Sequence, residues 1–363
     1  MFRREFLATG TAAGAVALAG CGSLESRAID VPPVPDDRPD AIYVPGHVEG
    51  MAMVGTATVG GYAVGVFYSY PHRFWTVTGS DRTRTSIEDD DSVHLMATVW
   101  DPETGIVLPE VGVSAAIRRD GSFVTQETIY AMLSGPMGVH HGANVAGLEE
   151  GDYEVAVTVG ATTSRRTGAF AGRFDEPATA TVAFTFDRSA MREIRFERLE
   201  EGGTRGALEP VSMDGVPTGV APAAEELPGE TTSATAGDVR YVATVLDPPA
   251  GVSGAGPYLA VSPRTRYNGY VLPRMGLSVT QDRGGTTAER SLTRTIDPAL
   301  GYHYGTTLPR EVDQRETSER ASGGAASREG GTVSITVETP PQVARHEGYE
   351  TAFFDVPTAT LSV

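Results

Sequence analysis

Lysine is absent from the 363-residue sequence, and cysteine occurs once, at Cys21. A single thiol excludes an internal disulfide and leaves no cysteine metal site or catalytic thiol downstream. Basic residues are scarce as well, because 29 arginines face 47 acidic residues and the net charge is −18. Nucleic acids require a basic binding surface, so we expect a protein that binds none. An acidic, lysine-free surface is typical of proteins that work in concentrated salt, as in halophiles; biased genomic base composition is the alternative explanation.

The short motifs of common enzymes are also missing. The sequence contains no G-x-S-x-G elbow, no H-E-x-x-H motif and no P-loop. We therefore predict that the protein is not an enzyme, and a redox-active copper enzyme is the weakest alternative. The apolar run at residues 8–19 is too short and too rich in Ala and Gly to be a membrane span.

Residues 1–21 have the features of an export signal. Arg3 and Arg4 form a twin-arginine (Tat) motif, and the apolar run ends in Leu-Ala-Gly-Cys, which resembles a lipobox. Cleavage at a lipobox leaves a lipidated cysteine, so Cys21 is the predicted lipid anchor. We expect export in the folded state, a location at the extracellular face of the cell membrane, and a flexible stalk over residues 22–40.

Short strands separated by turns are predicted for the rest of the chain. The sequence holds 43 glycines and 24 prolines, and segments such as 153–159 and 333–337 alternate with the period of a half-buried strand. We predict an all-β protein of two tandem immunoglobulin-like β-sandwich domains, copy one at 41–187 and copy two at 233–363, each of about seven strands. Residues 188–232 are predicted to be a short helix and linker.

An internal repeat supports this division, because three segments recur in the same order. These are Val107-Leu108-Pro109 with Val271-Leu272-Pro273, Gly138–Gly142 with Gly301–Gly305, and Phe174-Asp175 with Phe354-Asp355. The repeat also aligns each candidate ligand of copy one with a residue of copy two. His140 coincides with His303, whereas the counterparts of four other residues differ: Tyr258 for His94, Ala260 for Met96, Thr295 for Met132 and Tyr304 for His141.

Imidazole and thioether groups are the predicted metal ligands. His94 and Met96 lie two residues apart on a predicted strand and so face the same side. Without thiolates, such groups suit copper, or ferrous iron where carboxylates join. The metal-site candidates are His94, Met96, Met132 and His140, with His346, His303, Met51 and His141 as weaker candidates. The alternative is that these side chains only fill the core.

Two further segments contain histidine. On a strand, His47, Glu49, Met51 and Met53 would line one face, which makes Met51 a weaker ligand candidate; an exposed linker edge is the alternative. His72 follows Pro71 in a predicted loop and is expected at the surface rather than among the ligands.

The order of these residues resembles the periplasmic iron-transport proteins, immunoglobulin-like β-sandwiches that accompany ferrous-iron permeases and bind copper with iron or manganese. The resemblance rests on His94-Leu-Met, Met132 about forty residues later, and the run His140-His141-Gly-Ala-Asn144 before an alternating strand. The chain is similar also to duplicated halophile lipoproteins described as iron transporters. The resemblance implies that His94, Met132 and His140 are ligands, and that Met96 replaces the family's glutamate.

The resemblance also implies a late histidine, which is Arg166 in copy one and is retained as His346, after Arg345, in copy two. Since family members often work as homodimers, we hypothesise an internal pseudo-dimer in which His346 completes the site of copy one; a homodimer is the alternative. The implied function is a membrane-anchored extracytoplasmic protein that captures copper and/or iron and assists an iron permease or other uptake protein. A surface lipoprotein with tandem modules for adhesion or protein binding is the alternative function.

Overall fold

The computed structural model describes residues 31–254, 256–283, 286–309 and 331–363. The predicted signal, the anchor Cys21 and stalk residues 22–30 therefore lie outside the described residues. The fold is all-β with several sheets, as predicted, and is consistent with β-sandwich domains. Among the described residues, no helix is both long enough and apolar enough to cross a membrane.

One long strand joins the two strand layers of the first copy. Five strands run in the order β2-β3-β6-β9-β8 and four in the order β8-β7-β10-β12, so the 13-residue β8 belongs to both. The strands are β2 (Ala52–Val59), β3 (Tyr62–Ser69), β6 (Asp91–Trp100), β7 (Val113–Arg119), β8 (Ser122–Ser134), β9 (Gly138–Ala146), β10 (Gly151–Val159) and β12 (Ala178–Phe186). A hairpin of β4 (Phe74–Thr78) and β5 (Asp81–Thr85) follows β3.

The second copy repeats the strand order of these two layers. Its sheets run in the orders β14-β15-β16-β20-β19 and β18-β17-β21-β23. Two differences are seen in the described residues: β8 has two counterparts, β18 and β19, separated by Leu292, and no hairpin corresponds to β4 and β5. The strands are β14 (Thr231–Ala236), β15 (Val239–Leu246), β16 (Tyr258–Thr265), β17 (Gly276–Arg283), β18 (Thr286–Ser291), β19 (Thr293–Asp297), β20 (Gly301–Thr307), β21 (Thr332–Thr339) and β23 (Ala359–Ser362).

The burial of each strand explains whether its sequence shows the alternation of apolar and polar residues from which a strand can be predicted. Strands β10 and β12 alternate buried and more exposed positions, so their apolar residues recur with period two. Strand β3 is buried at all eight positions, and a strand covered on both faces carries no such alternation.

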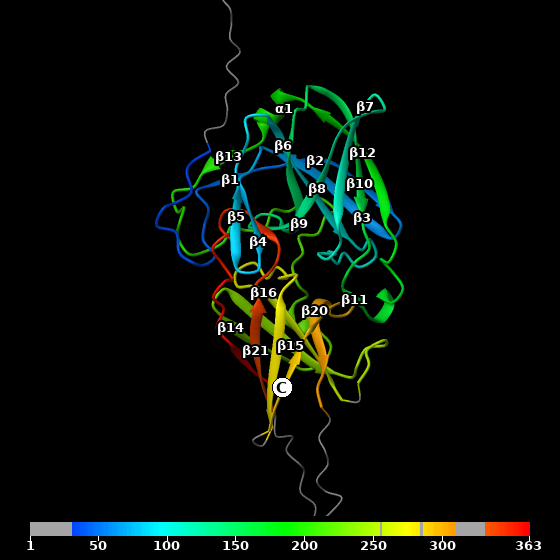
Figure 1. Cartoon of the computed structure of the whole chain (residues 1–363), viewed down its shortest axis with the longest axis vertical. Coiled ribbons are helices and arrows are strands. Elements are labelled where there is room, and N and C mark those ends of the chain that lie inside the picture. Colours follow the sequence, from blue (N-terminus) through cyan, green and yellow to red (C-terminus); the bar gives the residue numbers. More distant parts are fainter. Residues whose placement is uncertain (1–30, 255, 284–285, 310–330) are drawn as a thin grey trace, which may run out of the picture. The chain divides into compact units, whose positions relative to one another are not determined.

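Each copy lends a two-residue strand to the other. β11 (Arg165–Arg166) of copy one pairs in parallel with β19, and β22 (Ala344–Arg345) of copy two pairs in parallel with β8 and antiparallel with β4. In Figure 1, β11 lies at the level of β16 and β20, which belong to the copy-two sheet that it extends. Thr167 and His346, which follow these strands, each donate a backbone N–H to the other copy over 3.0 Å. The counterpart of His346 is therefore Thr167, and the expectation that Arg166 stands at its position was wrong by one residue.

The segment between the copies is packed along much of its length. Helix α1 (Arg188–Glu193) lies in the predicted helical region, with Asp187 capping its first turn. β13 (Phe196–Arg198) then pairs with β1 (His47–Glu49). The linker also contains a 3-10 turn at Ala224–Glu226. A second 3-10 turn, Gly168–Phe170, lies in copy one.

The end of the predicted stalk is also packed. Arg38 forms an ion pair of 2.7 Å with the buried Glu350, and the Thr351 hydroxyl donates to the Pro39 carbonyl. Residues 38–40 are therefore held against copy two, contrary to the flexible stalk expected over 22–40.

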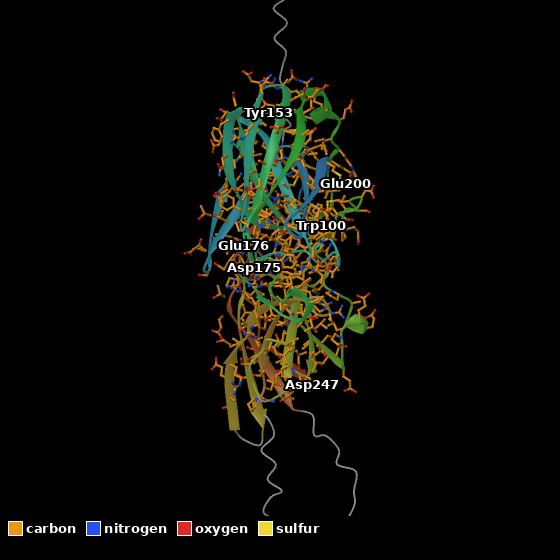
Figure 2. All side chains as sticks on the ribbon, turned by 90° about the vertical axis from the view of Figure 1, so that its right-hand side faces the viewer. Trp100, Tyr153, Asp175, Glu176, Glu200 and Asp247 are labelled. Atoms are coloured by element: carbon orange, nitrogen blue, oxygen red, sulfur yellow. The ribbon has the colours of Figure 1, made fainter. Side chains whose placement is uncertain are left out.

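The core of the second copy extends into the first. Its apolar cluster includes Tyr270 and Tyr302 together with Leu133 and Val139 of copy one. Figure 2 shows Trp100 between the levels of Tyr153 and Asp247 along the molecule's long axis. The shared core and the exchanged strands fix the two copies against each other at the place where His346 enters copy one.

Candidate metal centre

Strand register brings four predicted ligands onto one face. His94 on β6 lies opposite Asn144 on β9, and His140 on β9 lies opposite Met132 on β8. Directly opposed residues, and residues two apart, share a sheet face. Met132 in turn lies opposite Ala344 on β22, which places His346 beside this group. Figure 1 shows β6, β8 and β9 as neighbours.

The ligand atoms of His94, His140 and His346 all lie within 4.8 Å of one another. The Met132 sulfur lies 3.3 Å from Nε2 of His346. Three nitrogens bonded to one ion at about 2.0–2.1 Å lie about 3.3–3.6 Å apart in tetrahedral or trigonal geometry. The longest of the three separations must therefore close by about 1.2–1.5 Å for the three imidazoles to bind one ion.

Two of these histidines present unpartnered nitrogens. Nε2 of His94 and Nε2 of His140 are buried without a hydrogen-bond partner. The opposite ring nitrogens are engaged, because Nδ1 of His94 lies 2.8 Å from Asn144 Oδ1 and Nδ1 of His140 lies 3.1 Å from the Gly138 carbonyl. Both acceptors require Nδ1 to carry the proton, which leaves the Nε2 lone pairs free. Metal-bound histidines are oriented in this way.

The Asn144 amide is held in one orientation. Its Nδ2 donates to the His72 carbonyl at 2.9 Å and to Asp91 Oδ2 at 3.0 Å. Because both contacts require a donor, the oxygen of the amide must face His94 and the His72 N–H. The network thus fixes which nitrogen of His94 is available for a metal ion.

All three imidazoles are neutral at physiological pH. Burial lowers the pKa of His94 to about 3 and that of His140 to about 4. Burial, and then the neighbouring His72, holds the pKa of His346 well below its ordinary value. A neutral imidazole is the form that binds metal, so protons do not compete for the site near pH 7.

Gly142 provides the space in front of the ligands. A Cβ at this position would lie 2.6 Å from Nε2 of His94 and 3.1 Å from the Met132 sulfur. Any larger residue would push on both ligand atoms. Phe74 and Ala344 cover Met132 on the apolar side, and Met132 is fully buried.

His72 belongs to the centre, contrary to its predicted surface position. Its ring lies 4.6 Å from that of His94 and 5.0 Å from that of His346, centroid to centroid. Its Nδ1 is 3.3 Å from Glu49 Oε2, and the other carboxylate oxygen of Glu49 is 3.1 Å from His47 Nε2. The available sequence signal was the place of His72 just after a strand: β3 ends at Ser69, which pairs with His94, so the residues that follow Ser69 lie close to His94.

The expected single strand over His47–Met53 is not formed. β1 ends at Glu49 and β2 begins at Ala52, so the four side chains do not line one face. Met53 is 44% exposed, and Met51 packs beside an apolar cluster that contains Met96, Phe67 and Trp100.

Three other candidates do not join the imidazole cluster. Met96 lies in that apolar cluster, which is separate from the cluster of Met132. His141, next to His140 on β9, faces the other side of the sheet, and its Nε2 lies 3.2 Å from the Val111 carbonyl. His303 is in copy two, where its Nε2 lies 3.0 Å from the Tyr258 hydroxyl.

The corresponding position in copy two lacks the metal ligands. Tyr258, Thr295 and Thr167 stand where copy one has His94, Met132 and His346. The counterpart of Gly142 is Gly305, where a Cβ would lie 1.8 Å from the Tyr258 hydroxyl oxygen. A tyrosine hydroxyl therefore occupies the space that a metal ion would need, and it satisfies His303 directly.

Comparison with known proteins gives a family but no ligand. The family described as Domain of unknown function (DUF7350) matches residues 57–171 and 225–362. No curated protein matches the chain. Among solved structures, FetP of uropathogenic Escherichia coli strain F11 is 17% identical with a TM-score of 0.29, covering 39% of this chain and 95% of its own.

Two structures of P19 from Campylobacter jejuni are similar at the same level. A copper-bound variant is 17% identical, with a TM-score of 0.31 and coverage of 38% of this chain and 98% of its own. The copper-reconstituted protein is 18% identical, with a TM-score of 0.29 and coverage of 39% and 96%. At these identities and TM-scores the similarity supports no inference about a ligand here, so the centre is judged by its own geometry.

Proposed function

The chain belongs to the family described as Domain of unknown function (DUF7350), and we propose that it binds one transition-metal ion between His94, His140, His346 and Met132. The carrying observation is that two buried, unpartnered Nε2 atoms converge with a third imidazole and a thioether. Leaving a buried polar atom unsatisfied costs about 1–3 kcal/mol. A bound ion would satisfy both nitrogens at once.

Copper is the metal that this donor set favours. Three imidazoles and a thioether are soft to borderline ligands, and a thioether selects copper over harder ions. Iron, the other metal expected from the sequence, is better served by carboxylates. Glu49 approaches this group, but it contacts His72 and His47 rather than the three clustered imidazoles. We therefore rank copper above iron.

We further propose that the protein carries metal rather than catalyses a reaction. Thioether ligation is compatible with exchange and hand-off, and the motifs of Arg3-Arg4 and Cys21 support export and a lipid anchor outside the cytoplasm. In this proposal the two copies act as a covalent pseudo-dimer that supplies an uptake permease for copper or iron. A Cys21→Ser variant should leave the membrane fraction while metal binding is retained.

Metal titration of the purified chain tests the proposal. We expect one equivalent of copper per chain, bound more tightly than iron. His140→Ala should weaken binding at least a hundredfold, because it removes one of four ligands. His141→Ala is the matched control, since this adjacent histidine is equally buried but faces the other side of the sheet; it should bind copper as the unmodified chain does.

The His346→Ala variant tests the contribution of copy two. We expect a loss comparable to that of His140→Ala, with the fold checked by circular dichroism. Absence of copper and iron binding in the unmodified chain would refute the proposal and leave tandem β-modules for protein or glycan binding as the function. Unchanged affinity in both variants would refute the assignment of the ligands.

A further inference from the structure

Two arginines with no acidic partner face each other in the second copy. Arg240 on β15 is directly opposite Arg264 on β16. Like charges at directly opposed positions of an antiparallel pair are destabilising. No described carboxylate lies within 4 Å of either guanidinium, although the chain carries 47 acidic residues. In the described part of the chain, the charges of this opposed pair are therefore not compensated by a nearby carboxylate.

Arg264 is buried and incompletely bonded. It is 6% exposed, its Nε lies 3.1 Å from the Ser262 hydroxyl, and its Nη2 is buried with no hydrogen-bond partner. Burial, and then the charge of Arg240, lowers the pKa of Arg264 to about 10, so it remains charged at neutral pH. A buried charge without a partner is strongly unfavourable.

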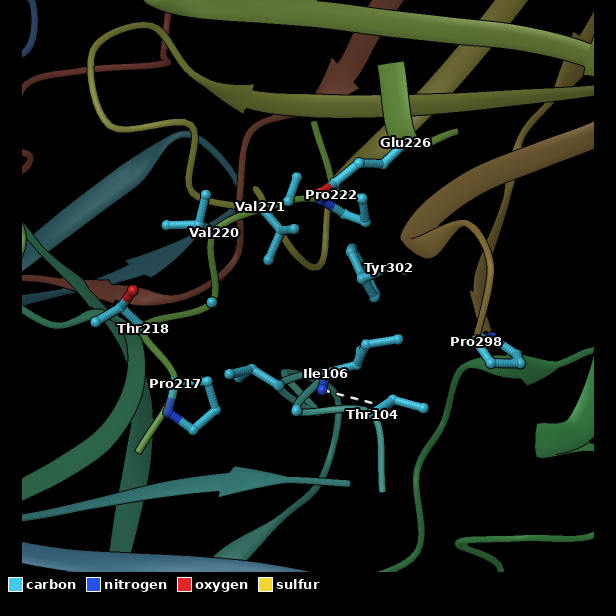
Figure 3. Close-up of a pocket in the computed structure, with 15 residues that line it drawn as sticks. Thr104, Ile106, Pro217, Thr218, Val220, Pro222, Glu226, Val271, Pro298 and Tyr302 are labelled. Carbon is cyan, nitrogen blue, oxygen red and sulfur yellow. Dashed lines mark hydrogen bonds between the residues drawn. The ribbon is translucent and has the colours of Figure 1, made fainter. Parts of the chain in front are cut away.

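Arg240 and Arg264 both line a surface pocket of about 420 Å³. Arg266, which is exposed, lines it too, and its Nη1 lies 3.3 Å from the Gly237 carbonyl. Glu226 supplies one acidic side chain, and its Oε2 accepts the backbone N–H of Ala223. Three arginines and one glutamate leave a net charge of +2. Figure 3 shows the adjoining pocket, which shares Val220 and Glu226 with this one.

From this geometry we infer that the pocket binds a small oxyanion, the carboxylate or phosphate group of an organic or inorganic anion. A guanidinium binds such groups through paired N–H donors, and charge-assisted hydrogen bonds of this kind are the strong ones. A bound oxyanion would neutralise the repulsion between Arg264 and Arg240. Because Nη2 of Arg264 is fully buried, the guanidinium must turn toward the pocket for this nitrogen to donate to the anion. The inference is independent of metal binding, because the pocket contains none of the four proposed metal ligands.

The test is calorimetric titration of the metal-free full chain at low ionic strength with inorganic phosphate and, separately, with succinate. We expect one equivalent of at least one of these anions to bind, and the one that binds identifies the group. Arg264→Gln should weaken binding at least tenfold. Since that buried position also affects folding, Arg240→Gln is the second variant, and it should weaken binding to a similar degree.

A matched control is Arg118→Gln, at an exposed arginine of copy one, which should not change anion binding. Without anion, Arg240→Gln should raise the melting temperature, because it removes the repulsion. Chloride at equal ionic strength should not stabilise the chain as the oxyanion does. Equal stabilisation by chloride, unchanged binding in Arg240→Gln, or no binding of either anion would overturn the inference.

Discussion

Replacing Gly142 by alanine perturbs the metal centre without removing any ligand. The new Cβ would lie 2.6 Å from Nε2 of His94, whereas ordinary contacts begin at 3.4 Å, so the nitrogen must withdraw by about 0.8 Å. That movement is large against a metal–nitrogen bond of about 2.0–2.1 Å. The Met132 sulfur, at 3.1 Å from the Cβ, must also give by a few tenths of an ångström.

We therefore expect Gly142→Ala to weaken copper binding by about 10–100-fold, which corresponds to roughly 1.4–2.8 kcal/mol. Overpacking of this kind should lower the free energy of unfolding by about 1–3 kcal/mol. Affinity is measured by titration against a competing chelator, and stability by urea unfolding of the metal-free chain. Gly112→Ala is the control, because a Cβ there meets nothing within 4 Å. Copper affinity equal to that of the Gly112→Ala control, in a folded Gly142→Ala chain, would show that Nε2 of His94 is not a ligand.

Three further outcomes are expected. Because burial lowers the pKa of His94 to about 3 and that of His140 to about 4, copper affinity should be nearly constant from pH 7 to pH 5 and fall below about pH 4; a decline centred near pH 6.5 would contradict the burial of the site. Burial also lowers the pKa of His303 to about 4 from an ordinary 6.5, so on acidification His303 is protonated in the unfolded chain before it is protonated in the folded chain. The free energy of unfolding should therefore fall by about 1.4 kcal/mol per pH unit for this residue as pH drops from about 6.5 to 4. Urea unfolding at several pH values, with His303→Gln for comparison, measures this loss. Tyr258→Phe should lower the free energy of unfolding by about 1–2 kcal/mol and leave copper stoichiometry at one, and a second equivalent of copper would show that copy two binds metal after all.

The parts of the fold that alternate in sequence could be predicted. Strands β10 and β21 were visible because one face of each is buried, and the duplication was visible because turn and strand residues recur in order. The fully buried β3 carried no periodic signal. The two-residue strands β11 and β22 could not be found, since their partners lie in the other copy and no local pattern specifies such a pairing.

The candidate site was predictable to the extent that it follows strand periodicity. His94, Met132 and His140 could be grouped from spacing and the resemblance, and His346 from the resemblance and the hypothesis of an internal pseudo-dimer. His72 was missed because its closeness to His94 depends on the register of β3 against β6, which only the fold reveals. Met96 shared the predicted face of His94, but its thioether packs with Phe67 and Trp100. Periodicity gives the face of a sheet and not the distance along it.

Because β11 and β22 each pair with a strand of the other copy, the sequences of the two copies can diverge in a way that separate identical subunits cannot. In an assembly of identical subunits, every substitution appears on both sides of the symmetry axis, so one centre cannot be discarded while its twin is kept. A fused chain escapes this constraint: Tyr258 could replace an imidazole in one half only, while that same half still delivers His346 to its neighbour. Tethering also makes the delivery insensitive to dilution, because the donor is always present at a high effective concentration.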